Sequence, residues 1–227
     1  MKDRIVIKLS GNLFEKDYVG YLKDIVGMYK ELSKDYDIHF VVGGGKTARN
    51  YIEIGEKLGF NNYLLDVVGM NVARINALLL SFYIGLDNVY FPIPRSSEEL
   101  LTACSSNKTI VMAGLQPGQS TMTVASLLAE ALGSGKLIYL TKYYGLYEED
   151  PEKNPNARLI KEIELSRAEQ YLRTNSLPGG YELLDKHAQD ILLRSSIYVY
   201  ITSFKDPKEI KNIIENKEFK GTKVIPK

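Results

Sequence analysis

Two short segments of the chain combine basic side chains with glycines that expose the backbone. Lys8 to Asn12 (KLSGN) ends one apolar run, and Gly43 to Arg49 (GGGKTAR) ends another. Glycine lets main-chain N–H groups approach an anion, and lysine or arginine adds positive charge. Three glycines before a helix also leave its first N–H groups free for a phosphate. The spacing differs from that of a P-loop, so the sequence predicts anion binding by another kind of loop.

A third segment, Gly114 to Thr121 (GLQPGQST), carries small, polar and uncharged side chains. Such side chains suit hydrogen bonding to a base, a sugar or a phosphate. Ser120 or Thr121 also suits the N-cap of a following helix, and the two uses are compatible. A fourth segment, Thr141 to Tyr147, places aromatic rings in a loop, where they can flank a base. For Tyr143 the sequence favours ordinary packing instead.

An acidic residue, Asp66, lies near the start of a helical region. A carboxylate there could accept two hydroxyl hydrogen bonds from a ribose, but its position alone favours helix capping. His39 lies inside an apolar run and is interpreted as a packed residue. The lysine-rich stretch from 205 to 220 is interpreted as a solvated helix face.

The composition excludes several classes of protein. The formal net charge is +1, without the basic excess of proteins that grip a nucleic-acid backbone. A single cysteine, Cys104, excludes an internal disulfide and a cysteine-rich zinc site. Two histidines, His39 and His187, argue against a multi-histidine metal site. The apolar stretch from Ala77 to Leu86 is half the length needed to span a bilayer, and no targeting segment is visible. We therefore expect a cytoplasmic protein with no membrane or nucleic-acid partner.

The segments singled out above need a fold that brings them together. Short β-like runs alternate with longer amphipathic ones, which predicts an α/β fold with a mostly parallel sheet covered by helices on both faces. Strands are expected at Arg4–Leu9, Asp37–Val42, Asn88–Phe91, Thr109–Ala113, Lys136–Leu140, Tyr198–Thr202 and Thr222–Ile225. Helices are expected at Tyr18–Asp35, Thr47–Leu58, Asp66–Leu86, Thr121–Leu132, Leu165–Thr174, Tyr181–Ser195 and Pro207–Glu215. We expect one domain spanning residues 1–227, with ligands at the carboxyl ends of the strands.

Taken in order, these motifs resemble the amino acid kinase superfamily, and within it the archaeal-type uridylate (UMP) kinases. The resemblance covers nearly the whole chain, and GLQPGQST followed by GYELLD (Gly180 to Asp185) is its most specific part. It rests on KLSG, VVGGGKTAR (Val41 to Arg49), LLDVVGM (Leu64 to Met70), ARINA (Ala73 to Ala77), GLQPGQST, GLYEEDP (Gly145 to Pro151) and GYELLD. The resemblance implies an open α/β/α sandwich, a homo-hexamer, and phosphoryl transfer from ATP to UMP with Mg²⁺ carried mainly by the nucleotide phosphates.

The resemblance also implies roles for individual residues. Lys8 and Arg49 would be catalytic, and no residue would bind the metal directly. The ATP side would comprise Lys8, Leu9, Ser10, Gly11, Asn12, Gly45, Arg49, Thr141, Lys142, Tyr147 and Asp150. The UMP side would comprise Gly44, Asp66, Gly114, Leu115, Gln116, Pro117, Gly118, Gln119, Ser120 and Thr121. The part before residue 136 or so would thus mainly bind UMP, and the part after it mainly ATP.

One position departs from the family pattern. The fourth motif of the family usually ends in Asp-Gly, whereas this chain has Tyr144 before Gly145. The substitution removes a carboxylate from the ATP side and adds a ring. Two other interpretations of the function stay open: a kinase of the same superfamily with another acceptor, and a nucleotide-binding protein without catalysis.

Overall fold

A seven-stranded sheet with the strand order β3-β2-β1-β4-β6-β7-β5 forms the centre of the fold. The computed structural model describes residues 2–154, 156–172 and 185–227. The strands are β1 (Arg4–Leu9), β2 (Asp37–Val42), β3 (Val111–Met112), β4 (Lys136–Thr141), β5 (Glu162–Glu164), β6 (Tyr198–Ser203) and β7 (Thr222–Ile225). Neighbouring strands are parallel except β6 and β7, which are antiparallel. The predicted α/β fold with a mostly parallel sheet is confirmed.

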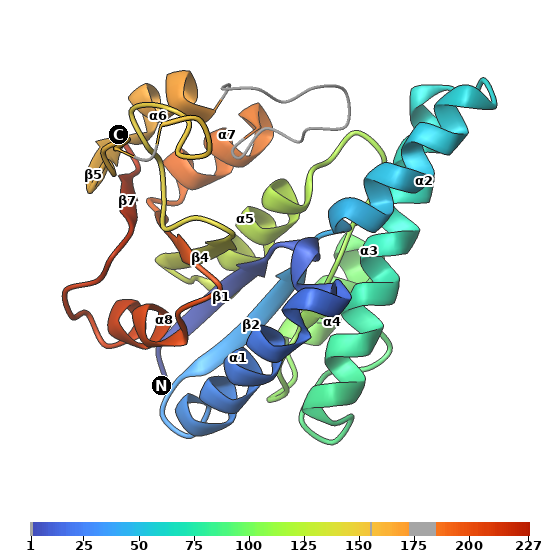
Figure 1. Cartoon of the computed structure of the whole chain (residues 1–227). Helices are drawn as coiled ribbons and strands as arrows, with labels where there is room; N and C mark the ends of the chain where they lie inside the picture. Colours follow the sequence, from blue (N-terminus) through green and yellow to red (C-terminus); the bar gives the residue numbers. More distant parts are fainter. Residues whose placement is uncertain (1, 155, 173–184) are drawn as a thin grey trace.

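Helices cover both faces of this sheet (Figure 1). They are α1 (Val19–Leu32), α2 (Gly45–Lys57), α3 (Asn62–Ile84), α4 (Ser97–Cys104), α5 (Thr121–Leu132), α6 (Leu165–Leu172), α7 (Lys186–Arg194) and α8 (Pro207–Ile214). Side chains alternate along each strand, so β1 contributes to two cores. Ile5, Ile7 and Leu9 pack with α1, α3 and α8, whereas Val6 packs with α5 and α7. Apolar surface is thus buried on both sides, as expected for a mostly parallel sheet.

The long helix α3 begins at Asn62, four residues before the predicted start at Asp66. The Asn61 side chain accepts a hydrogen bond from the Leu64 amide at 3.0 Å, so Asn61 is the N-cap. Asp66 therefore lies inside the helix and does not cap it. Helix α3 is long and apolar enough to cross a membrane, but one face of it packs against β2, β3 and α2 as part of the core.

The predicted strand Asn88–Phe91 is wrong, because only Val89 forms a bridge, with Thr109. Pro92 and Pro94 follow it and have no amide hydrogen to continue a ladder. The predicted strand Thr109–Ala113 shortens to β3. The Ile110 amide, one residue before β3, donates a hydrogen bond to Nδ1 of His39 at 3.1 Å. A side chain thus takes the place of a carbonyl group of the neighbouring strand at this position. The sequence analysis also missed α4 and the short strand β5.

The remaining predicted elements agree with the structure to within a few residues at their ends. Helix α2 begins two residues earlier than expected, at Gly45, directly after the glycine run. Helix α7 begins at Lys186, after its N-cap Asp185. The predicted start of that helix at Tyr181, and most of the GYELLD motif, lie outside the described residues.

Candidate active site

The loops that follow β1, β2 and β3 meet at the carboxyl ends of these strands and enclose a cavity of about 170 Å³. Ligands of open α/β sheets bind at this edge. The predicted site residues that line the cavity are Lys8, Ser10, Gly11, Gly44, Gly45, Arg49, Gly114, Gln119 and Thr121. Three of the four predicted segments, far apart in the sequence, therefore share one cleft, whereas the segment from Thr141 to Tyr147 does not line it.

The glycines of the first two loops are needed because the loops touch each other. A Cβ atom on Gly45 would lie 2.4 Å from the carbonyl carbon of Gly11, and its φ of +67° also disfavours side chains. A Cβ atom on Gly114 would meet the Met70 side chain at 2.6 Å. The bare backbone thus lets the loops close around the cavity.

Lys8 is the last residue but one of β1 and lines the cavity, and only 7% of the residue is exposed. Its Nζ lies 3.9 Å from the centre of the Tyr139 ring, a cation–π contact. Among the described residues, no carboxylate forms an ion pair with this ammonium group. A buried cation whose one partner is an aromatic face is placed to attract an anion from solution.

The N-terminus of α2 faces the same cavity. Its N-cap is Gly44, which supplies no side-chain hydrogen bond, so the first amides of the helix have no side-chain cap. The Asn76 side chain donates to the Gly43 carbonyl at 2.9 Å and fixes the glycine run from the α3 side. One turn into the helix, Arg49 donates to Oδ1 of Asn12 at 3.3 Å. The helix dipole, Lys8 and Arg49 thus place positive charge around one cleft.

The loop from Gly114 to Ser120 leads into α5 and is fixed by a contact with α3. The Gly118 amide donates to Oδ2 of Asp66 at 2.8 Å. Gln119 lines the cavity, and its buried Oε1 has no donor within the described part of the chain. An unused acceptor at this place would accept a hydrogen bond from an N–H or O–H group of a ligand.

Several predicted site residues do not line the cavity. Leu9 and Leu115 have buried side chains in the two cores. Gln116, Pro117 and Gly118 belong to the same loop but do not line the cavity. Thr141, Lys142, Tyr147 and Asp150 follow β4, beyond the cavity wall formed by Tyr139.

The loop after β4 is braced by its own contacts. Lys142 forms an ion pair with Glu152 at 2.8 Å. Hydrogen bonds to Glu152 and Tyr143 raise the pKa of the Lys142 ammonium group. The Tyr144 ring lies under Lys220, whose Nζ is 3.8 Å from the ring centre. Burial raises the pKa of the Tyr144 hydroxyl, and Asp206 and Glu209 nearby add to the effect.

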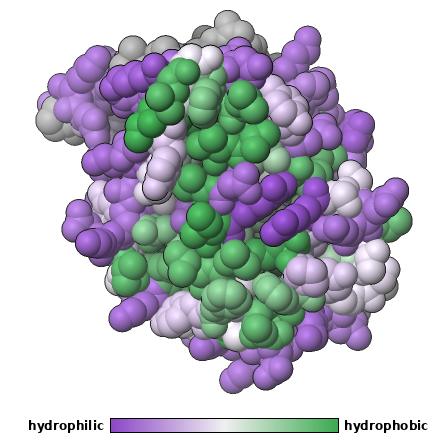
Figure 2. Space-filling model, turned by 90° about the vertical axis from the view of Figure 1, so that its right-hand side faces the viewer, coloured by the Kyte–Doolittle hydropathy of each residue, from purple (hydrophilic) through white to green (hydrophobic). Residues whose placement is uncertain are grey.

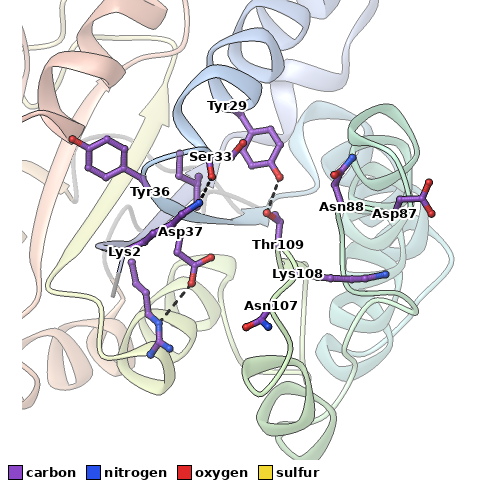
Figure 3. Close-up of a pocket in the computed structure, with 12 residues that line it drawn as sticks. Lys2, Tyr29, Ser33, Tyr36, Asp37, Asp87, Asn88, Asn107, Lys108 and Thr109 are labelled. Atoms are coloured by element: carbon purple, nitrogen blue, oxygen red, sulfur yellow. Dashed lines mark hydrogen bonds and ion pairs between the residues drawn. The ribbon is translucent and has the colours of Figure 1, made fainter.

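A larger cavity, of about 500 Å³, lies at the opposite end of the strands (Figure 3). Two of its basic side chains already have partners within the fold. Lys2 donates to the Ser33 carbonyl at 2.7 Å, and Nε of Arg4 lies 3.6 Å from Asp37. The Tyr29 hydroxyl is hydrogen-bonded to Thr109. This cavity has no glycine-lined loop and no uncapped helix N-terminus, so the smaller cleft is the better candidate for an anionic ligand.

Comparison with known proteins shows the family of the chain. The model of the amino acid kinase family matches residues 3–203. The chain belongs to the amino acid kinase family. It is 39% identical over 222 residues to a uridylate kinase of Pyrobaculum neutrophilum, covering 97% of this chain and 98% of that protein. It is 37% identical over 231 residues to a uridylate kinase of Staphylothermus marinus, covering 100% of both.

A solved structure of the same family has the same fold. The crystal structure of uridylate kinase from Archaeoglobus fulgidus has a TM-score of 0.82 and 26% sequence identity, covering 99% of this chain and 100% of that one. The likeness spans the whole sheet and its helices, so the cleft described above belongs to a fold shared along the full length of the chain.

The sequence analysis missed three residues that build the cleft of this family member. Tyr139 lies under Lys8, Asn76 holds the glycine run, and Asp185 contacts the start of α5. Asn76 carried a signal, because it is a polar residue at a buried position of an apolar helix. Tyr139 carried none, because its partner is 131 residues away in the sequence. Asp185 ends the GYELLD motif, but that motif did not reveal its contact with α5, more than 60 residues away.

Proposed function

We propose that the chain transfers the γ-phosphoryl group of ATP to UMP, giving ADP and UDP. Uridylate kinases 35–39% identical to the chain over nearly its full length support this activity. Within the site, the proposal rests on the surroundings of Lys8. Its buried ammonium group has no carboxylate partner among the described residues and faces an uncapped helix N-terminus across one cleft.

UMP is assigned to the side of the cleft formed by the β2 and β3 loops. Gly44, Gly114 and Thr121 line it, and the unused Oε1 of Gln119 can accept a hydrogen bond from the ligand. Asp66 uses one carboxylate oxygen for the Gly118 amide, which leaves its other oxygen for a ribose hydroxyl. These contacts support the assignment of residues before about 136 to the acceptor.

We assign ATP to the other side of the cleft, at the carboxyl ends of β1, β4 and β6. Lys8, Ser10, Gly11, Gly45 and Arg49 line the part of the cleft where its phosphates would lie. Thr141, Lys142, Tyr147 and Asp150 lie in the loop after β4, and we assign them to the rest of the ATP molecule. The nucleotides would then meet with their phosphates together above Lys8.

The chemistry follows from charge. An oxygen of the UMP phosphate is already anionic at neutral pH, so it can attack the γ-phosphorus without a strong general base. The new O–P bond forms as the bond to the β–γ bridging oxygen breaks, and ADP leaves with that electron pair. Lys8, Arg49 and the amides of α2 offset the repulsion between the two polyanions and stabilise the transferred group.

Mg²⁺ fits this site through the nucleotide. Among the described residues, no group of three or more His, Cys, Asp or Glu side chains could hold a metal ion, so the phosphates would supply most of its ligands. The ion would neutralise charge on the β- and γ-phosphates when bound.

A coupled ADP-release assay tests the proposal. We expect rapid turnover with UMP and at least tenfold lower kcat/KM with CMP, AMP, carbamate, N-acetylglutamate and isopentenyl phosphate. Preference for one of the other acceptors would replace UMP with that compound. Calorimetry with UMP and a non-hydrolysable ATP analogue identifies the remaining case, because binding of both without turnover would overturn catalysis.

We also propose a homo-hexamer in the cytoplasm. Exposed apolar side chains on α3 follow the spacing of a single helix face, and about half of each is exposed. They are Ile75, Leu79, Phe82 and Tyr83. Figure 2 shows hydrophobic side chains gathered over the side of the molecule that carries α2 and α3. Patches of this kind mark protein interfaces.

Light scattering on the purified protein tests the assembly. Leu79→Lys should lower the mass from that of six chains, whereas Leu193→Lys on the exposed side of α7 should leave it unchanged. A wild-type mass of one chain would overturn the hexamer.

A further inference from the structure

One carboxylate joins the N-termini of helices α5 and α7. Asp185 is the N-cap of α7 and accepts a hydrogen bond from the Ala188 amide at 3.1 Å. The same carboxylate accepts from the Thr123 hydroxyl at 2.6 Å and from the Ser120 hydroxyl. Ser120 is the N-cap of α5 and ends the loop from Gly114 to Ser120, here called the acceptor loop, and Thr123 lies in the first turn of α5. Asp185 therefore connects the loop to a helix more than 60 residues further along the chain.

This contact uses the whole hydrogen-bonding capacity of Ser120. A serine hydroxyl has one hydrogen to donate and two lone pairs to accept with. The hydrogen is donated to Asp185, and the oxygen accepts from the Met122 and Thr123 amides, both at 3.0 Å. Ser120 therefore has no hydrogen-bonding group left for a ligand.

The same contacts show which group of α5 is left for a phosphate. The amides of Met122 and Thr123 are used by the N-cap, and the Thr123 hydroxyl is used by Asp185. The Thr121 hydroxyl has no partner among the described residues, and Thr121 lines the cavity. At the start of α5, the Thr121 hydroxyl is thus available to a ligand, whereas the Ser120 and Thr123 hydroxyls are hydrogen-bonded to Asp185.

The acceptor loop is held from its other side as well. Asp66 on α3 accepts from the Gly118 amide, two residues before Ser120. The loop thus lies between two carboxylates, one from α3 and one from the start of α7. With both contacts made, Gln119 and Thr121 face the cavity.

We propose that Asp185 is a positioning residue for the acceptor nucleotide. It touches no ligand itself, and it holds Ser120 and Thr123 so that Gln119 and Thr121 keep their places in the cleft. This inference rests on the proposed function, because it assumes that the loop binds the acceptor. Preorganisation of this kind lowers the cost of binding without adding a contact to the ligand.

Asp185→Asn tests the role with little effect on α7, because an asparagine oxygen also caps a helix. The amide keeps one acceptor and replaces the other with a donor, so one of the two hydroxyl contacts is lost. We expect KM for UMP to rise about tenfold, the size expected for one hydrogen bond to a charged group. KM for ATP and the melting temperature should stay within the change caused by Asp190→Asn, an exposed aspartate on the same helix.

A double-mutant cycle shows whether the effect passes through Ser120. Ser120→Ala should also raise KM for UMP, and Ser120→Ala/Asp185→Asn should be no worse than Asp185→Asn alone. Additive effects would overturn the proposed link. An unchanged KM for UMP, or equal rises for both nucleotides together with a lower melting temperature, would overturn the positioning role.

The wild-type protein separates this inference from the proposed function. If it prefers another acceptor over UMP, the proposed function fails, and the same variants are measured with that acceptor. If it uses UMP and the variants behave like Asp190→Asn, only the role of Asp185 fails. If the wild-type protein has no turnover, calorimetric binding of UMP gives the same comparison through Kd.

Discussion

Gly11 and Gly45 lie backbone against backbone: a Cβ atom on Gly11 would be 2.1 Å from the Gly45 nitrogen. No side chain fits into this contact, because the atoms opposite are main-chain atoms that cannot rotate away. The contact fixes the loop after β1 against the start of α2. Lys8 and the uncapped amides of α2 therefore keep a constant distance.

Gly11→Ala should separate these two loops. We expect kcat to fall at least tenfold, because misplacement of about 1 Å in the catalytic groups can cost as much as a hundredfold. Gly27→Ala is the matched control, since a Cβ there meets nothing within 4 Å and Gly27 lies within α1. That change should stabilise the protein by about 1 kcal/mol and leave kcat unchanged. Steady-state kinetics and urea unfolding check both variants, and equal kinetics would contradict the prediction.

Lys8→Ala removes the buried ammonium group at the end of β1. Its charge is most useful when charge builds up on the transferred phosphoryl group, so we expect kcat to fall about a hundredfold or more. KM for UMP should change much less. Lys46→Ala, an exposed lysine in the neighbouring glycine-rich segment, serves as the control and should have little effect on kcat. Small and equal losses in kcat and UMP affinity after Lys8→Ala would argue against this role.

The sequence resemblance places Tyr144 where an aspartate is expected, and Nζ of Lys220 lies over the Tyr144 ring. Tyr144→Ala removes the ring from the loop after β4, so KM for ATP should rise several-fold while KM for UMP stays constant. Tyr144→Phe keeps the cation–π contact, so it should behave like the wild-type protein. Kinetics with each nucleotide varied in turn check this, and a change confined to UMP would refute it.

The pH dependence of stability should depend in part on Asp37. The neighbouring His39, with Nε2 3.2 Å from Asp37 Oδ1, is the main cause that lowers the pKa of the carboxyl group, and Arg4 adds to it. A lowered folded-state pKa stabilises the protein above the ordinary value of about 3.9, and this contribution is lost as the pH falls through the folded-state pKa. Because 37% of the side chain is exposed, solvent screens the effect.

Urea unfolding between pH 6 and about pH 2 measures this contribution. The wild-type protein should lose more stability on acidification than Asp37→Asn. Asp24→Asn, an exposed change on α1, should follow the wild-type curve. Parallel curves for the wild-type protein and Asp37→Asn would show that the pair contributes nothing.

The sequence predicted the elements well where one short segment alone determines the local structure. The apolar runs of β1, β2 and β4 and the glycines after them could be read directly, because strand, turn and helix start are local features. The start of α3 was misplaced because Asn61, a good N-cap, precedes an apolar pattern that extends ahead of Asp66. The partners of Ser120 and Lys8 could not be predicted, because Asp185 and Tyr139 reach them only through the packing of distant elements.

Strand β1 lies inside the sheet, with β2 and β3 on one side and β4, β6, β7 and β5 on the other. The chain builds one flank completely before it crosses to the other. A substitution in β2 or β3 therefore falls on one flank of the sheet, and a substitution in β4, β5, β6 or β7 falls on the other. A substitution at Tyr144, which follows β4, thus leaves the strands of the earlier flank untouched.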